Sequence, residues 1–214
     1  MDESLWSLSL SNRDREIQTG LMYAKFRTAI TENLSFLEKL STRDLLNQIA
    51  WLARNLLELL VWVKYCSSSQ ARAREFWDDS IRDLYSLIDP KDENDPDFLS
   101  RLGKAVAMIG PEKDPKAWTR TSRAAKAIKQ LEYERTSQTL SKFVHPTAMS
   151  ILLRLPLQSR RIIQKGFVES GRAFASEALQ ELEGSLMAAL YNKYKSSIQK
   201  ALKSPEGKSL EIGL

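Results

Sequence analysis

The chain has 214 residues, of which 43% are hydrophobic and 28% charged, and its formal net charge is +5. This composition is typical of a globular protein with a sizeable core, and it excludes a disordered or low-complexity chain. The single cysteine, Cys66, excludes an internal disulfide framework, and its position at the end of an apolar helix predicts a reduced, partly buried structural thiol.

The N-terminus and the most apolar stretch both favour a cytoplasmic protein without a membrane span. Met1-Asp2-Glu3-Ser4 carries acids where a secretory signal carries bases, and no long apolar run follows it. The stretch at 45–65 is long enough to cross a bilayer, but Arg54, Glu58 and Lys64 interrupt it. We therefore expect a buried helix there and no contact with a membrane.

The first half of the chain predicts a loose arm at 1–12 and then a series of amphipathic helices. Apolar residues recur every three to four positions from Ile17 to Leu40, which predicts the first helix. Ser41-Thr42-Arg43-Asp44 resembles a helix cap, so we expect the second, central apolar helix at about 42–67. A third helix is expected at 71–88.

The second half predicts three further helical stretches and a tail. Asp95-Pro96 starts a short helix that ends at Gly110-Pro111, and a helix rich in Ala, Lys and Arg is expected from Trp118 to Val144. Pro146 breaks that helix, and a restarted one ends near Pro156.

A long C-terminal helix is expected at 158–202, either overhanging, bent near Gly166, Gly171 or Gly184, or packed on a second copy. The tail is 204–214. Since no segment has the alternation of a strand, the predicted fold is an all-α multi-helix bundle with one domain at 13–203.

Charge is segregated along the chain. Residues 75–97 hold nine acids against two bases, whereas residues 112–165 hold twelve bases against four acids. Such asymmetry is consistent with pairing between two helical faces, with a basic surface for polyanions, or with a charge-complementary oligomer. The sequence leaves these three open.

The only histidine, His145, lies where the helix breaks before Pro146. Its imidazole can cap the restarting helix or bond a freed carbonyl, which is the structural interpretation. A junction can also project it into a crevice, where a carboxylate such as Glu58 would orient it for proton transfer.

Arg54 and Glu58 are the second candidate pair. They lie four residues apart in the most apolar helix, a spacing at which two side chains meet. An internal ion pair is the structural interpretation, because unpaired burial of a charge is costly. The functional hypothesis places Arg54, Glu58 and His145 around one pocket as possible catalytic residues.

A row of cations is the third candidate, and it could contact nucleic acid. Several of these side chains share one helix face, and Trp118 nearby offers a surface for base stacking. A solvated face is the alternative. The row consists of Lys116, Arg120, Arg123, Lys126 and Lys129.

Motifs for a metal or a cofactor are missing from the sequence. It has no second histidine, no Cys-x-x-Cys, no glycine-rich phosphate loop and no Gly-x-Ser-x-Gly. Asp78, Asp79 and Asp83 form the best acidic cluster, and we expect it to be exposed and to favour solubility. We therefore predict no metal and no cofactor.

The Arg54-Asn55-Leu56-Leu57-Glu58 helix and the downstream Ser141–Pro146 segment together resemble bacterial helical domains of unknown function. Such domains are distantly similar to the HEPN superfamily, which includes nucleases and nucleotide binders of toxin–antitoxin and phage-defence systems. The resemblance spans about residues 20–195. It implies a homodimer formed through long helices, with His145, Arg54 and Glu58 as site residues.

One departure from the HEPN pattern bears on activity. Nuclease members carry an arginine that is separated from the catalytic histidine by four to six intervening residues, whereas Gln138, Thr139 and Leu140 occupy those positions here. We therefore expect a protein that binds a nucleotide or RNA and that is not an enzyme, with ribonuclease activity as the first to test. The alternative is a non-catalytic module that binds another protein or a second copy.

Overall fold

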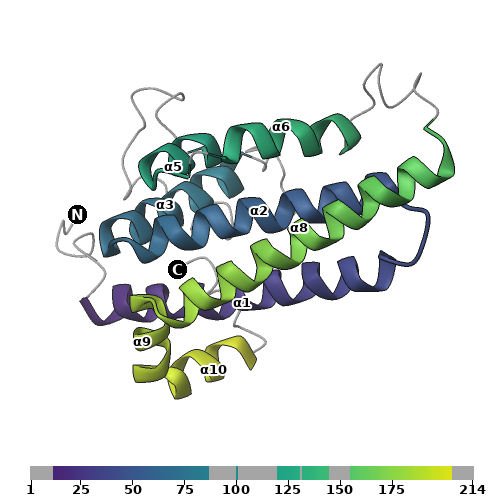
Figure 1. Cartoon of the computed structure of the whole chain (residues 1–214). Coiled ribbons are helices and arrows are strands. Elements are labelled where there is room, and N and C mark those ends of the chain that lie inside the picture. Colours follow the sequence, from purple (N-terminus) through teal and green to yellow (C-terminus); the bar gives the residue numbers. More distant parts are fainter. Residues whose placement is uncertain (1–11, 87–99, 101–119, 131, 145–154, 204–214) are drawn as a thin grey trace. The chain divides into compact units, whose positions relative to one another are not determined.

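The computed structural model describes residues 12–86, 100, 120–130, 132–144 and 155–203 (Figure 1). Within these ranges every regular element is an α-helix and no strand occurs, so the predicted all-α class is confirmed. The helices are α1 (Asn12–Leu40), α2 (Leu46–Ser67), α3 (Gln70–Ser86), α5 (Thr121–Ala127), α6 (Tyr133–Val144), α8 (Leu157–Glu183), α9 (Leu186–Lys193) and α10 (Lys195–Lys203).

The chain forms two compact units. Unit 1 comprises Met1–Tyr23, Ser69–Thr119 and Leu186–Leu214, and unit 2 comprises Ala24–Ser68 and Arg120–Ser185. The division falls within α1. The predicted tail, and all of the predicted arm except Asn12, lie outside the described residues, and the single domain at 13–203 stays a prediction.

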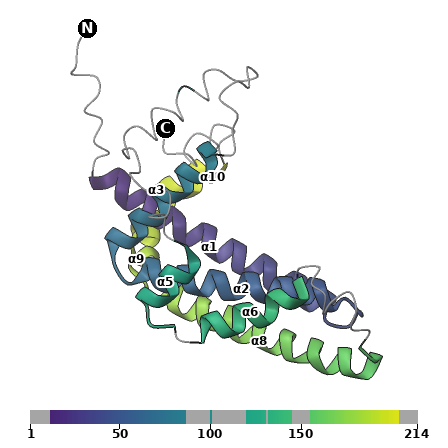
Figure 2. The same cartoon turned by 90° about the horizontal axis from the view of Figure 1, so that it is seen from above.

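Unit 2 is built around α2, as the apolar pattern predicted. Twelve of its 22 residues are buried, and Figures 1 and 2 both show α2 running alongside α6 and α8. Leu56, Leu60 and Val61 of α2 have no exposed surface, and Leu182 of α8 is equally buried. Cys66 is buried at the end of α2, so its predicted burial is confirmed.

A glycine sets how closely α8 approaches its neighbours in unit 2. A Cβ at Gly171 would lie 2.6 Å from Leu37 Cδ2, 3.4 Å from Leu56 Cδ1 and 3.6 Å from Ala53 Cα. The missing side chain therefore makes room for α1 and α2 at this position. By contrast, a Cβ at Gly166, on the same helix, would meet nothing within 4 Å.

Unit 1 joins the start of α1 to α9 and α10. A Cβ at Gly20 would lie 2.9 Å from both Ile198 Cδ1 and the backbone nitrogen of Tyr191, so any larger residue would force the helices apart. The Glu16 carboxylate accepts hydrogen bonds from Lys193 Nζ at 2.7 Å and from the Tyr194 hydroxyl at 2.5 Å. These bonds lower the pKa of Glu16.

The helix expected from Trp118 to Val144 is interrupted, and that prediction was wrong at residues 128–130 and 132. The backbone NH of Gln130 donates to Ala125 O at 2.9 Å, and that of Lys129 donates to Lys126 O at 3.1 Å. This Schellman-type ending requires a left-handed residue, and Lys129 has a φ of 58°. Because lysine stands where glycine is usual, the sequence did not signal the break.

The helix expected at 158–202 is also divided, and one of the three expected bends, at Gly184, is where it ends. α8 stops at Glu183, and the Ser185 hydroxyl donates to Leu182 O at 2.6 Å. The Ser185 backbone NH also donates to the same carbonyl at 3.2 Å, and α9 starts at Leu186. At about 1.5 Å per residue, α8 is still about 40 Å long.

The start of α2 differs from the predicted cap. The helix begins at Leu46, its cap residue is Leu45, and no side chain bonds the first turn. The Asp44 carboxylate instead lies 3.1 Å from Arg160 Nη2 of α8, so it joins two helices instead of capping one.

The acidic cluster of α3 is less exposed than the sequence suggested. Asp79 is buried, whereas Asp83 is exposed to solvent. Partial burial and the charge of Asp79 both raise the pKa of Asp83. None of the described helices has the length and hydropathy needed to cross a bilayer.

Candidate functional sites

Arg54 and Glu58 form an ion pair on the partly exposed side of α2. Arg54 Nε lies 3.0 Å from Glu58 Oε1, and the two side chains are 28% and 29% exposed. The preceding polar residues of the same stripe, Asn47 and Gln48, are exposed. The stripe therefore reaches water along part of its length, and the pair fits the structural interpretation of an i,i+4 bridge.

Tyr133 of α6 lies within electrostatic range of this pair, and sequence analysis did not identify it. Its pKa is raised mainly by burial and further by the Glu58 charge, whereas hydrogen bonds with Ser137 and Thr121 lower it. The Tyr133 side chain is buried, and its hydroxyl is already engaged by Ser137 and Thr121. Arg54, Glu58 and Tyr133 thus bring a cation, a carboxylate and a phenol together.

Two candidate residues cannot be placed beside this cluster. His145 and Lys116 both lie outside the described residues. The hypothesis that His145 shares a pocket with Arg54 and Glu58 therefore stays a prediction.

The four described cations of the basic row are all exposed, on α5 and the residues flanking it. Buried Ala124 and Ala125 lie on the other side of α5, which packs against α2. Lys126 Nζ lies 3.7 Å from Glu134 Oε1, and both side chains are more than 60% exposed. The attraction between these two exposed charges is therefore weak. We call Arg120, Arg123, Lys126 and Lys129 the α5 cations.

A pocket that the sequence did not reveal lies in unit 2, between the turn joining α1 to α2 and the first half of α8. Its volume is about 340 Å³. The turn contributes Ser41, Thr42, Arg43 and Asp44, and α8 contributes Arg161, Gln164, Lys165, Val168, Glu169 and Arg172. The only sequence signal for it was the run of bases that begins the last helix, because the two walls are about 120 residues apart in the chain.

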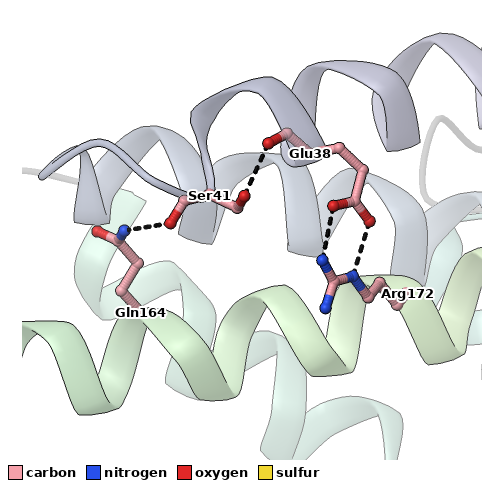
Figure 3. A network of polar contacts seen from close by, with 4 residues as sticks. All are labelled: Glu38, Ser41, Gln164 and Arg172. Atoms are coloured by element: carbon pink, nitrogen blue, oxygen red, sulfur yellow. Dashed lines mark hydrogen bonds and ion pairs between the residues drawn. The ribbon is translucent and has the colours of Figure 1, made fainter.

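Gln164 joins the two walls of this pocket (Figure 3). Its Nε2 donates to Ser41 O at 3.1 Å, the bond drawn in Figure 3. It also donates to Arg43 O at 2.7 Å, and the residue is only 7% exposed. Its Oε1 is buried and has no hydrogen-bond partner among the described residues. A buried acceptor without a donor destabilises the fold by about 1–3 kcal/mol, so a ligand that donates a hydrogen bond to this atom would be favoured.

The cations around the pocket differ in how firmly they are held. Arg172 binds Glu38 through two bonds, Nε to Oε1 at 2.7 Å and Nη2 to Oε2 at 2.6 Å, and these bonds lower the pKa of Glu38 (Figure 3). Lys165 Nζ lies 3.9 Å from Glu169 Oε1, near the limit of an ion pair. Arg43 and Arg161 have no acidic partner within the described part of the chain.

No family model, no curated protein and no solved structure matches this chain. Any function must therefore be inferred from its own residues.

The chemistry that these residues offer is recognition of negative charge. The described residues of unit 2 hold sixteen Lys or Arg against ten Asp or Glu. Guanidinium and ammonium groups bind phosphate oxygens through charge-assisted hydrogen bonds. Within the described ranges, no three His, Cys, Asp or Glu side chains are placed to hold a metal ion.

Proposed function

We propose that this chain binds a nucleotide or RNA through the α5 cations, without a catalytic step. The observation that carries the proposal is that Arg120, Arg123, Lys126 and Lys129 are all exposed on one short stretch of unit 2. Several cations close together can contact successive phosphates of one strand. The HEPN-like resemblance stays a prediction that agrees with this proposal.

The neighbouring cluster on α2 and α6 supports the same surface. Arg54 is part-exposed, and its charge acts on Tyr133, which also interacts with Thr121 at the start of α5. The cluster therefore lies beside the α5 cations and offers the part-exposed Arg54 and Glu58 to a bound base or ribose. Glu58 would also repel phosphates, so we expect the strand to follow α5 and not α2.

The test is the binding of a fluorescein-labelled 20-nucleotide single-stranded RNA, and of labelled ATP, followed by anisotropy at several salt concentrations. Replacing Arg120, Lys126 and Lys129 together by Gln should weaken RNA binding. It should also make the slope of log Kd against log salt shallower by about 2, since each phosphate contact contributes about 0.7 to that slope for single strands.

The matched control replaces three exposed lysines on α1 and α10, namely Lys25, Lys195 and Lys200, by Gln. It lowers the net charge equally but leaves the α5 cations in place. An equal loss of RNA affinity in both variants would indicate nonspecific attraction and would contradict the proposal. So would a triple α5 variant that binds both ligands as the unmodified protein does.

A second candidate function, self-association, is favoured by exposed apolar side chains on unit 2. Phe36, Trp51, Leu157 and Ile162 are each half or more exposed, and Ile162 reaches 66%. Large exposed apolar groups mark interaction surfaces when they gather. Sedimentation velocity over a range of concentrations tests this candidate, and an apolar dimer should persist at high salt, where RNA binding is lost.

A further inference from the structure

We propose that the pocket between the α1–α2 turn and α8 binds a phosphate group, either as inorganic phosphate or as the phosphomonoester of a larger ligand. The proposal goes beyond the α5 surface, because the pocket lies at the opposite end of α2. Gln130, which follows α5, accepts a hydrogen bond from Lys64 near the C-terminal end of α2, whereas Asp44 of the pocket precedes its first turn.

The first argument concerns which cations are available to a ligand. Arg172 is held by both oxygens of Glu38, so it belongs to the wall of the pocket. Arg43 comes from the turn and Arg161 from α8, and within the described ranges no acid pairs with either. Two guanidiniums on different walls of a pocket of about 340 Å³ can share the oxygens of one phosphate, a group that arginine binds in bidentate fashion.

The second argument concerns charge along α8. Arg160 and Arg161 lie at its first turn and Lys165 one turn later, whereas its first turn holds no acid. Its C-terminal end carries Glu181 and Glu183. This order is the reverse of what the helix dipole favours, since cations are repelled by the partial positive charge of an N-terminus. The Asp44 carboxylate offsets that repulsion for Arg160, and a bound anion would offset it for Arg161.

The third argument is the unpartnered oxygen of Gln164. Its amide nitrogen is committed to the carbonyls of Ser41 and Arg43, so the orientation of the amide is fixed and Oε1 faces no donor within the described residues. Inorganic phosphate keeps at least one P–OH at neutral pH, and a phosphomonoester, whose second pKa is about 6, carries one in a minority of molecules. Such a ligand could therefore supply the missing donor while its other oxygens contact the two arginines.

Alternative anions fit these features less well. A carboxylate has two oxygens in one plane, whereas a phosphate has oxygens in three directions and can contact the turn, α8 and Gln164 at once. The acids Asp44 and Glu169 also line the pocket, which disfavours ligands with many negative charges and favours a single phosphate.

The test is a titration of the ¹⁵N-labelled full chain with inorganic phosphate, followed through the backbone amides of 41–44 and the Nε–H signals of Arg43 and Arg161. Sodium chloride at matched ionic strength serves as the blank. We expect saturable shifts at these signals with phosphate alone. Replacing Arg43 and Arg161 together by Gln should weaken binding at least about tenfold, because two charge-assisted contacts are lost.

The matched control replaces Lys25 and Lys200 by Gln, which removes the same charge from exposed residues that do not line the pocket. It should bind phosphate as the unmodified chain does, and circular dichroism of both variants verifies that they fold. Equal shifts with sodium chloride, or unchanged affinity after loss of Arg43 and Arg161, would overturn the proposal.

Titration with AMP distinguishes the two sources of the phosphate. Tighter binding of AMP than of inorganic phosphate, lost in the Arg43/Arg161 variant, would support a phosphomonoester ligand, and equal affinity would support free phosphate. The triple α5 variant should retain phosphate binding in the pocket. The two proposals can therefore fail separately.

Discussion

Two glycines of α8 provide a matched test of the packing in unit 2. Alanine at Gly166, which faces open space, should stabilise the protein by about 1 kcal/mol through its better helix propensity. Alanine at Gly171 gains the same propensity but places a methyl group 2.6 Å from Leu37 Cδ2. Because Leu37 and Leu56 are fully buried, overpacking should cost about 1–3 kcal/mol.

The measurement is urea-induced unfolding followed by circular dichroism, with both variants compared with the unmodified chain. The Gly171→Ala protein should be less stable than the Gly166→Ala protein by about 1–3 kcal/mol. Adding Leu37→Ala to Gly171→Ala should remove the clash, so the two substitutions should couple favourably. If Gly171→Ala stabilises the protein as much as Gly166→Ala does, α8 is not in close contact with α1 and the described packing is wrong.

Two further predictions concern the polar links of unit 2. Because Arg172 lowers the pKa of Glu38 below 4.5, the ion pair stabilises the fold above that pH and is lost as pH falls through the folded pKa. The stability difference between Glu38→Gln and the unmodified chain should thus shrink below pH 4.5, and a constant difference would contradict the assignment. Replacing Gln164 by Leu removes the side-chain donor of the Ser41 and Arg43 carbonyls, of which the Arg43 carbonyl keeps its bond from the Leu45 amide, and should cost about 1–3 kcal/mol in urea unfolding. The control is Gln180→Leu at an exposed position of the same helix. An equal loss of stability there would show that the hydrogen bonds of Gln164 do not stabilise the fold.

Helix breaks separate what the sequence could predict from what it could not. Gly184 was among three glycines at which a bend was expected, and α8 ends there because Ser185 bonds back to Leu182. The break after α5 occurs at Lys129, a residue of good helix propensity, so local preference pointed the wrong way. Burial of Ala124, Ala125 and Tyr133 on either side of the break is a tertiary effect that outweighs that preference.

The candidate sites divide in the same way. Spacing alone brought Arg54 to Glu58, because side chains four residues apart meet on any helix. Spacing also placed the α5 cations on one short, exposed stretch. Tyr133 and Gln164 gave no such signal, since each one interacts with residues that lie far away in the chain.

The sequence by itself determined the helical class, the central position of α2 and the basic character of the segment that includes α5. These follow from periodicity and composition, which act within a few turns of the chain. Only the tertiary structure decided that Arg43 and Arg161 line one pocket, that Asp79 is buried and that Gly171 is in close contact with Leu37. Each of these depends on which helices pack together, and no local pattern specifies that choice because most apolar faces can pack against one another.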